Sequence, residues 1–191
     1  MEIRDGTLHG IKVIAPDPRR DERGWFLRVF DAALYAEVGI DHTRHVQENQ
    51  SRSARRTIRG LHTRSQLSEA KLIRCVHGSL FDVIVDLRPW SPTFLRWETF
   101  ELDDIDHRQI YVPAGFAHGF QALAEPTDIG YRVDSPYDPT LDVALAFNDP
   151  ELGIPWPLDD PIVSDRDRNA PTLAQLKPKF EEWYGTEPPA A

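Results

Sequence analysis

Short runs of alternating apolar and polar residues follow one another along most of the chain. The clearest is SLFDVIVDLR, residues 79–88, in which Phe81 and Val83 share one face of a strand while Asp82 and Asp86 share the other. Further runs of this kind occupy residues 24–30, 45–50, 57–63, 71–78, 95–102, 108–113, 119–124 and 128–134. Gly, Pro, Asp and Asn separate the runs, as in sandwiches and barrels. About ten strands at this spacing predict an all-β protein whose edges close as a jelly-roll barrel.

Two stretches with helical character interrupt the strands. Residues 31–39 predict a short helix near the N-terminus. Near the other end, four large apolar residues recur at helical spacing, namely Leu173, Leu176, Phe180 and Trp183. They predict a C-terminal helical segment at about 171–184, packed on the barrel, whereas residues 136–171 are rich in Pro and Asp and predict an ordered, irregular surface segment. At 191 residues, we expect one domain, 1–191.

The net charge of the chain limits the kinds of ligand and surface that the protein can bind. The chain carries 22 Lys and Arg against 31 Asp and Glu, a net charge of −9, which argues against general binding of nucleic acid or of an anionic membrane. Any anionic ligand would need a local basic pocket. The single cysteine, Cys75, cannot form an intrachain disulfide. Neither a signal-peptide core nor a membrane-length apolar run occurs, so we expect a soluble, cytoplasmic protein.

Three polar side chains fall on apolar strand faces. Lys71 alternates with Ile73 and Cys75, Tyr131 alternates with Ile129 and Val133, and His62 lies on the face of Ile58. A single buried His or Tyr is usually a satisfied structural residue. Burying a lysine is costly unless it is paired or faces an anionic ligand. The three together favour a polar ligand cavity inside the barrel.

Several other polar residues are candidates of lower specificity. Arg59 alternates to the face opposite His62, but Gly60 between them can supply a bend that brings both to one mouth. A guanidinium there suits a phosphate group, or equally a surface ion pair. Gln47 and Asn49 share one strand face, and His118 stands in the glycine-rich VPAGFAHGF. The amides of Gln47 and Asn49 are suited to binding sugar hydroxyls or phosphates, but they are equally common at the edge of a sheet. His118 is either a residue of a binding site or a core histidine bonded to the backbone.

Barrels of the cupin type often bind a metal through three histidines and a glutamate. The usual signature, two histidines one residue apart with a glutamate shortly after, is absent here, since DHTRH spaces its histidines three apart without a suitable carboxylate. A metal site built from His62 and His118 is therefore the weaker of the two interpretations.

Nine segments, spread over roughly residues 10 to 171, are characteristic together: DERGWF, QENQSRS, IRGLH, KLIRCVHGSLFDVIVDLR, SPTF, VPAGFAHGF, YRVDSPYDP, NDPELGIPWP and SDRD. In these segments, which run in family order, the chain resembles the dTDP-4-dehydrorhamnose 3,5-epimerases, the RmlC-like sugar-nucleotide epimerases. The resemblance implies a cupin-like jelly roll, a homodimer that exchanges N-terminal strands, and no metal or other cofactor.

The resemblance also implies roles for particular residues. His62 would be the base, oriented by Asp167 of SDRD, and Tyr131 the acid on the opposite face. Lys71, with His118 nearby, would stabilise an enolate. The remaining implied residues, which would hold the nucleotide diphosphate and sugar or lie near the base, are Arg59, Arg23, Gln47, Asn49 and Tyr137.

The chemistry of epimerisation explains these residue types. Inverting a carbon beside a 4-keto group requires a base, a stabilised enolate and an acid on the other face. An imidazole titrates near neutral pH, a carboxylate on its far nitrogen fixes the tautomer, and an ammonium offers a preorganised positive charge. We therefore expect an epimerase for a nucleotide-linked 4-keto-6-deoxy hexose, acting at C3, C5 or both.

Four arginines depart from the family pattern: Arg19, Arg20, Arg28 and Arg64, the last in LHTR where LHxQ is usual. We expect these arginines to lie around the nucleotide end of the substrate. The sequence therefore leaves open which nucleotide base the substrate carries. The alternatives are a C3 mono-epimerase for a GDP- or CDP-linked sugar, a metal-dependent cupin isomerase or dioxygenase, and a cupin that binds a sugar nucleotide without turnover.

Overall fold

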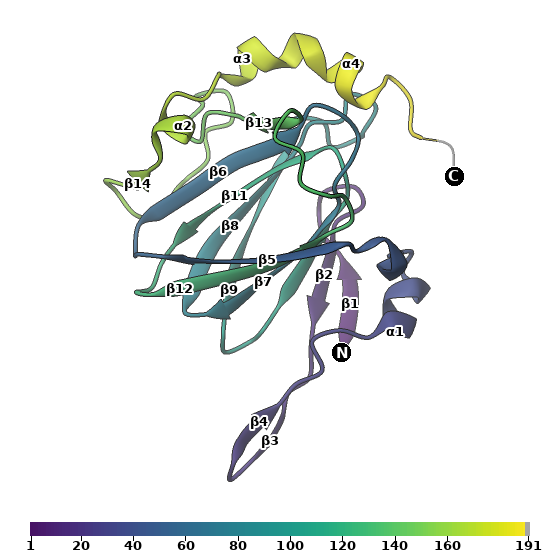
Figure 1. Cartoon of the computed structure of the whole chain (residues 1–191), viewed down its shortest axis with the longest axis vertical. Helices are drawn as coiled ribbons and strands as arrows, with labels where there is room; N and C mark the ends of the chain where they lie inside the picture. The colour runs from purple at the N-terminus through teal and green to yellow at the C-terminus, as the bar shows by residue number, and fades with distance from the viewer. Residues whose placement is uncertain (190–191) are drawn as a thin grey trace.

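Two antiparallel sheets face each other in the computed structural model, which describes residues 1–189 (Figure 1). The first sheet has the strand order β1 (Glu2–Asp5), β2 (Lys12–Ala15), β10 (Gln109–Val112), β7 (Lys71–His77), β12 (Thr127–Val133) and β5 (Gln47–Ser53). The second has the order β13 (Asp142–Ala144), β6 (Thr57–Arg64), β11 (Phe116–Ala122), β8 (Ser79–Asp86) and β9 (Trp97–Asp103), and β14 (Ile162–Val163) pairs in parallel with β6. The expected all-β jelly roll is confirmed.

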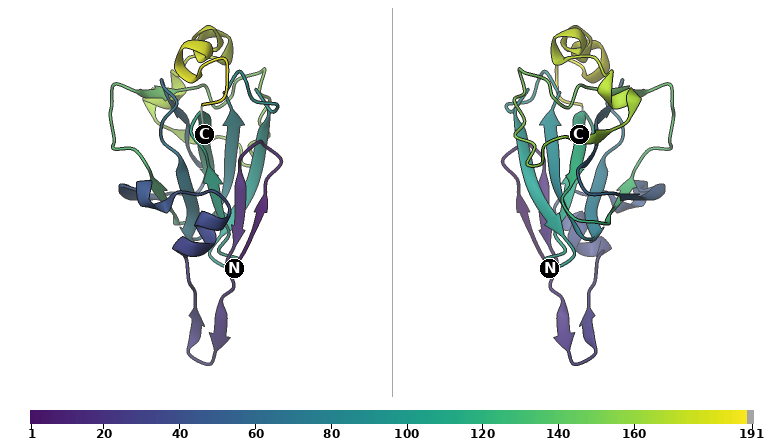
Figure 2. Two further views of the ribbon diagram at one scale, coloured as in Figure 1. Left: turned by 90° about the vertical axis from the view of Figure 1, so that its right-hand side faces the viewer. Right: turned by 90° about the vertical axis from the view of Figure 1, so that its left-hand side faces the viewer.

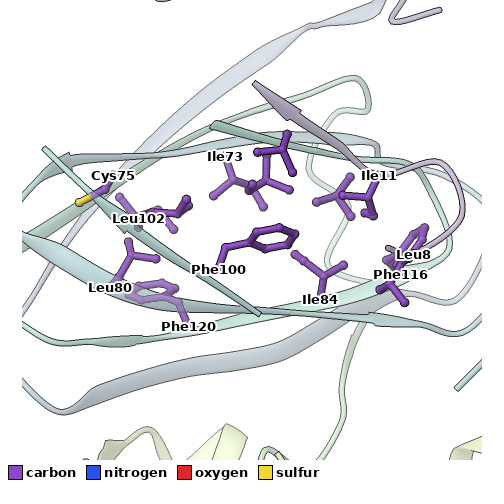
Figure 3. Packing of buried hydrophobic residues seen from close by; sticks show 14 residues of the cluster. Leu8, Ile11, Ile73, Cys75, Leu80, Ile84, Phe100, Leu102, Phe116 and Phe120 are labelled. Carbon is purple, nitrogen blue, oxygen red and sulfur yellow. The ribbon is translucent and has the colours of Figure 1, made fainter. Parts of the chain in front are cut away.

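The main core lies between the sheets, and Phe100 stands at its centre (Figure 3). Ile73 from the first sheet and Ile84 from the second are fully buried in the same cluster. Cys75 belongs to it as well, as a buried thiol. In β8 both faces are buried: Leu80 and Ile84 point into this core on the face that also carries Asp82 and Asp86, whereas the apolar face with Phe81 and Val83 packs under the C-terminal segment. Burial of apolar side chains therefore stabilises both sheets at once.

The outer face of the first sheet is covered by α1 (Ala32–Glu37), which is followed by the 3₁₀ helix η1 (His42–Arg44). Asp31 caps α1, because its side chain accepts hydrogen bonds from the backbone N–H groups of residues 33 and 34. Tyr35 is fully buried against Ile14 and Leu72 of the sheet. The helix predicted at 31–39 is therefore confirmed.

The outer face of the second sheet is covered by the C-terminal segment, which crosses the top of the molecule in Figure 1. It consists of α3 (Leu173–Leu176), the 3₁₀ helix η2 (Lys177–Lys179) and α4 (Phe180–Tyr184). Three of the four predicted apolar residues are buried, and Trp183 is partly buried. The segment expected at about 171–184 thus packs on the barrel as predicted.

A hairpin of β3 (Arg19–Asp21) and β4 (Gly24–Phe26) projects from the barrel (Figures 1 and 2). Its residues are exposed, including Trp25 and Phe26, which are 53% and 71% accessible. The strand predicted at 24–30 is too long, because pairing ends at Phe26 and the chain then leaves toward α1. Apolar alternation in this run reflects a surface that the chain itself does not cover.

A buried ion pair closes the end of β8. Arg88 Nη2 lies 2.7 Å from Asp86 Oδ2, and both side chains are almost inaccessible. The Asp86 carboxylate also accepts from Ser91 Oγ at 2.6 Å and from Thr93 Oγ1 at 2.7 Å. Burial alone would raise the pKa of Asp86, but Arg88 and the two hydroxyls hold that pKa below its ordinary value.

We expect Asp86→Ala to lower the free energy of unfolding by about 3–5 kcal/mol, because Arg88 would stay buried without its counter-charge. Since the folded pKa of Asp86 lies below the unfolded one, its ionisation adds stability above the unfolded pKa, near pH 4, and this part is lost as the pH falls through the folded pKa. Urea denaturation at about pH 7 and about pH 3 measures both effects. A difference between wild type and variant that does not shrink at the lower pH would contradict the prediction.

Candidate active site

A cavity of about 630 Å³ opens between the two sheets at one end of the barrel. Strands β5, β7 and β12 form one wall, β6 and β11 form the opposite wall, and the segment around β14 and α2 (Asp165–Arg168) lines its mouth. The cavity brings together nine of the ten candidate residues: Gln47, Asn49, Arg59, His62, Lys71, His118, Tyr131, Tyr137 and Asp167.

His62 and Asp167 form a hydrogen-bonded pair across a long stretch of chain. His62 Nε2 lies 2.7 Å from Asp167 Oδ1, and the Gly60 N–H donates to Asp167 Oδ2 at 3.3 Å. Burial alone would raise the pKa of Asp167, but the bond and charge of His62, with the Gly60 N–H, hold that pKa below its ordinary value. The carboxylate favours the His62 tautomer with its proton on Nε2, which leaves the lone pair on Nδ1.

Gly60 bends β6 so that Arg59 and His62 both line the cavity, as the sequence predicts. Its φ is +123°, in a region that favours glycine, and the pairing of β6 with β11 shifts register beside it. A Cβ at position 60 would lie 2.6 Å from Gly119 Cα and 2.8 Å from His118 O. Arg59 then reaches along β5, where its Nε donates to Ser53 Oγ at 3.1 Å.

Lys71 is paired inside the cavity. Its Nζ lies 2.9 Å from Glu69 Oε1, and Arg64 donates from Nε to Glu69 Oε2 at 2.8 Å. Burial by itself would raise the pKa of Glu69, but Lys71 and Arg64 hold that pKa below its ordinary value. The carboxylate is therefore ionised between two cations.

Tyr131 lies beside Lys71 on the same wall, because β12 pairs with β7. Burial, followed by the negative charge of Glu69, raises the pKa of the Tyr131 phenol. The phenol therefore keeps its proton throughout the neutral range and can donate it to a basic carbon or oxygen.

A second histidine–carboxylate pair stands next to the first. His118 on β11 is directly opposite His62 on β6, and its Nε2 lies 2.7 Å from Asp82 Oδ1. The Asp82 side chain is completely inaccessible and that of His118 is nearly so. His118 thus contributes to the wall of the cavity with an orientation fixed by Asp82.

Polar side chains from β5 and from the loop after β12 meet at one rim. Gln47 Nε2 donates to Asn49 Oδ1 at 2.8 Å, and the Tyr137 N–H donates to Gln47 Oε1 at 3.3 Å. The Tyr137 ring is largely exposed, at 60%. This rim of the cavity therefore presents amide donors and acceptors held in place by one another.

Arg23 is the one candidate that the fold of its own chain does not bring to the cavity. It lies in the turn of the projecting β3–β4 hairpin, its side chain is 85% accessible, and its Nη2 lies 2.6 Å from Asp21 Oδ2. Among the described residues of this chain, its contacts are local.

Arg64 lies apart from Arg59. The sequence pattern expects Arg64 around the nucleotide end, and this stays a prediction, but five strand positions, roughly 16 Å in an extended chain, separate the two residues along β6. Arg64 is buried at 6% accessibility and binds Glu69, which in turn binds Lys71. It belongs to the Lys71 end of the cavity.

Sequence reasoning missed four charged residues that line the cavity: Arg52, Glu69, Asp142 and Arg166. Arg166 Nη1 lies 2.7 Å from Asp142 Oδ2. Arg166 stands within SDRD and Glu69 stands two positions before Lys71, so proximity to the chosen residues was the available signal. Residues 136–171 are largely irregular and exposed, as predicted, but they also supply part of the cavity wall, because β14 pairs with β6 and α2 carries Asp167.

The donor sets fit hydrogen bonding better than metal ligation. His62 and His118 each face a separate aspartate. Within residues 1–189, no group of three or more His, Cys, Asp or Glu side chains is placed to hold a metal ion. In the same residues, no helix is long and apolar enough to cross a membrane.

Comparison with known proteins identifies the family. Residues 5–175 match the family described as dTDP-4-dehydrorhamnose 3,5-epimerase. The chain belongs to this family. It is therefore an enzyme, a carbohydrate epimerase of the isomerase class, and its jelly roll is the cupin-like, RmlC-like fold of that family.

Individual relatives are similar over most of their length. A dTDP-4-dehydrorhamnose 3,5-epimerase of Methanothermobacter thermautotrophicus is 41% identical over 166 residues, covering 85% of this chain and 89% of the relative. A dTDP-4-dehydrorhamnose 3-epimerase of Streptomyces niveus is 38% identical over 178 residues, covering 93% and 86%. The crystal structure of dTDP-6-deoxy-D-glucose-3,5-epimerase RmlC from Legionella pneumophila, in complex with dTDP-4-keto-L-rhamnose, has a TM-score of 0.89 at 36% identity and covers 100% of this chain and 99% of that one.

We expect Gly60→Ala to disrupt the epimerase site, because the new Cβ would meet backbone atoms of β11 that cannot move aside. The free energy of unfolding should fall by at least about 2 kcal/mol, and the enzyme should lose its epimerase activity. Gly39→Ala is the control: its φ is +79° but nothing lies within 4 Å of the added Cβ. Equal losses in the two variants would show that backbone strain, and not the contact with Gly119, dominates at position 60.

Proposed function

We propose that this epimerase acts on a dTDP-linked 4-keto-6-deoxy hexose of the dTDP-4-keto-6-deoxyglucose type, in deoxysugar biosynthesis. It removes the proton from C3, C5 or both, beside the 4-keto group, and returns a proton from the opposite face. The dTDP-sugar bound to the similar Legionella pneumophila enzyme supports the choice of nucleotide.

The observation that carries the proposal is the placement of a base and an acid on facing walls. His62 belongs to β6 of the second sheet, whereas Tyr131 belongs to β12 of the first sheet, and both line one cavity. A sugar ring held between the walls presents one face to each group. Inversion requires this arrangement, because a single group would return the proton to the face from which it came.

His62 acts as the base through Nδ1, since Asp167 occupies Nε2. When the imidazole takes the substrate proton, the carboxylate of Asp167 stabilises the positive ring and keeps its orientation. The lowered pKa of Asp167 keeps the carboxylate ionised at neutral pH, so that it remains an acceptor before and after the transfer.

Lys71 stabilises the enolate that forms when the carbon loses its proton. Negative charge moves from the carbon to the 4-keto oxygen, and a fixed ammonium at that oxygen lowers the barrier without reorganisation. Tyr131, with its raised pKa, delivers a proton to the other face of the carbon. Arg59, Gln47 and Asn49 hold the diphosphate and the sugar, and Tyr137 lies near the base.

We expect the wild-type enzyme in deuterium oxide to incorporate deuterium into dTDP-4-keto-6-deoxyglucose at C3, C5 or both, and more slowly into the GDP- and CDP-linked sugars. His62→Ala should reduce exchange at every position by about 100- to 10,000-fold, because no base remains. Tyr131→Phe should still permit some proton removal while blocking or diverting reprotonation. Proton NMR of the recovered sugar reads each position separately.

Matched controls exist outside the cavity. His77 also faces a carboxylate, with Nδ1 3.1 Å from Asp104 Oδ2, and Tyr111 lies in the cluster under α1. His77→Ala and Tyr111→Phe should exchange at the wild-type rate. Full activity in His62→Ala would refute its assignment as base, and a wild-type enzyme that exchanges neither carbon of any of the three sugars would refute the proposed reaction.

We also propose a homodimer in which the β3–β4 hairpin of one protomer brings Arg23 to the cavity of its partner. The hairpin exposes Trp25 and Phe26 and leaves Arg23 far from the cavity of its own chain. Exposed aromatic side chains on a projecting element are typical of a surface that a partner covers.

Phe26→Glu should therefore convert the protein into a monomer, which sedimentation velocity detects. Arg23→Gln should leave the dimer intact and raise the KM for the nucleotide sugar about 10-fold, because a hydrogen bond to a charged phosphate is lost. A wild-type monomer with full activity would contradict this assembly.

A further inference from the structure

Three charged side chains form one buried network where β6 ends and β7 begins. Glu69 receives Lys71 Nζ on Oε1 at 2.9 Å and the Arg64 guanidinium, through Nε and Nη2, on Oε2. The accessible fractions of the side chains are 6% for Arg64, 10% for Glu69 and 14% for Lys71. One carboxylate thus stands between two cations, with one oxygen turned to each.

The backbone of Glu69 indicates that its side chain matters. Its φ is +68°, in the left-handed region where glycine is the least strained residue. The turn is fixed from both sides, since the Ala70 N–H donates to Asp134 Oδ1 at 2.7 Å and the Asp134 N–H donates to Ala70 O at 3.3 Å. A glutamate in this conformation contributes a carboxylate that glycine could not supply.

Resting on the proposed function, we propose that Arg64 and Glu69 are positioning residues that together set the charge which Lys71 presents to the enolate. Glu69 holds the ammonium in place, and Arg64 cancels the charge of Glu69. The three side chains therefore keep one net positive charge at the sugar end of the cavity.

The physical reason lies in the long range of charge interactions at a poorly solvated site. A carboxylate 2.9 Å from Lys71 would by itself oppose most of the field that the ammonium exerts on a developing oxyanion. Arg64 binds the same carboxylate from the other side and offsets it. An arginine suits this task because it remains charged when buried and offers two parallel donors.

The arginine and the glutamate are therefore required as a pair. A neutral residue at position 64 combined with Glu69 would leave Lys71 facing an uncompensated carboxylate, because Glu69 lies 2.9 Å from Lys71. The charge at position 64 is thus tied to the acidic residue at position 69.

Arg64 has a second set of contacts, which any test must separate from its charge. Its Nη1 donates to Asp138 O at 2.7 Å, and its guanidinium lies 5.5 Å from the centre of the Tyr137 ring. Loss of Arg64 therefore also loosens the segment that carries Tyr137. Glutamine at both 64 and 69 loses these contacts equally but restores one net positive charge.

The test is a double-variant cycle of Arg64→Gln, Glu69→Gln and the two combined, with the deuterium-exchange rate measured at saturating dTDP-4-keto-6-deoxyglucose. We expect Arg64→Gln to lower this rate by about 10- to 100-fold with little change in the Kd for dTDP, because the loss falls on enolate formation. Glu69→Gln leaves two adjacent cations without a counter-charge and should lose activity too. The double variant should return to within about 3-fold of wild type.

The control is the exposed pair formed by Arg132 and Glu48, whose Nε and Oε2 atoms lie 2.9 Å apart on the far side of β12 and β5. Arg132→Gln, Glu48→Gln and their combination remove the same groups outside the cavity and should leave the exchange rate unchanged. Thermal unfolding and dTDP binding are measured for every variant, so that rates refer to folded, ligand-competent enzyme.

The proposal is overturned if the double variant is as slow as Arg64→Gln, because the Tyr137 segment would then account for the loss. It is also overturned if Arg64→Gln loses only stability or dTDP affinity while its rate at saturation equals that of wild type. Either result leaves the proposed function standing, since wild type still exchanges. Only a wild-type enzyme that exchanges deuterium at neither C3 nor C5 would refute the proposed function.

Discussion

A charge buried between two sheets must have a partner, because the space excludes the water that would otherwise solvate it. This requirement organises the barrel of the epimerase. Asp86 and Arg88 form a static pair at the end of β8, whereas in the cavity His62 and Lys71 are each held by a carboxylate. The static pair is sealed from solvent, but the cavity pairs each leave one polar group facing open space, where a substrate can replace water as the partner.

Strand β6 supplies several of the polar groups that line the cavity. Its bend at Gly60 aims Arg59 and His62 into one cavity, and the N–H of the same residue helps to hold Asp167. The opposite wall, made by β7 and β12, brings the ammonium and the phenol on neighbouring strands. The two packed sheets therefore fix the distance between His62 and Tyr131.

Alternation along the strands was sufficient to find His62, Lys71 and Tyr131, because a regular strand fixes the face of each side chain. It could not find Glu69, which precedes β7 in a left-handed conformation outside any strand period. The pairing of Asp167 with His62 was reached only through family resemblance, since 105 positions separate the two and local pattern carries no such information. The share of residues 136–171 in the cavity wall escaped the local pattern for the same reason, because β14 reaches β6 only through long-range pairing.

The C-terminal segment reaches the same strand from outside. Tyr184 of α4 is buried, and its hydroxyl donates to the carbonyl oxygen of Arg64 at 2.8 Å and lies 2.8 Å from Thr63 Oγ1. Thr63 points away from the cavity while its neighbours His62 and Arg64 point into it. The last helix, α4, thus supports β6 from outside. A substitution on one side of this contact would require a compensating change on the other side. A substitution in α4 can accordingly shift β6, although no residue of α4 lines the cavity.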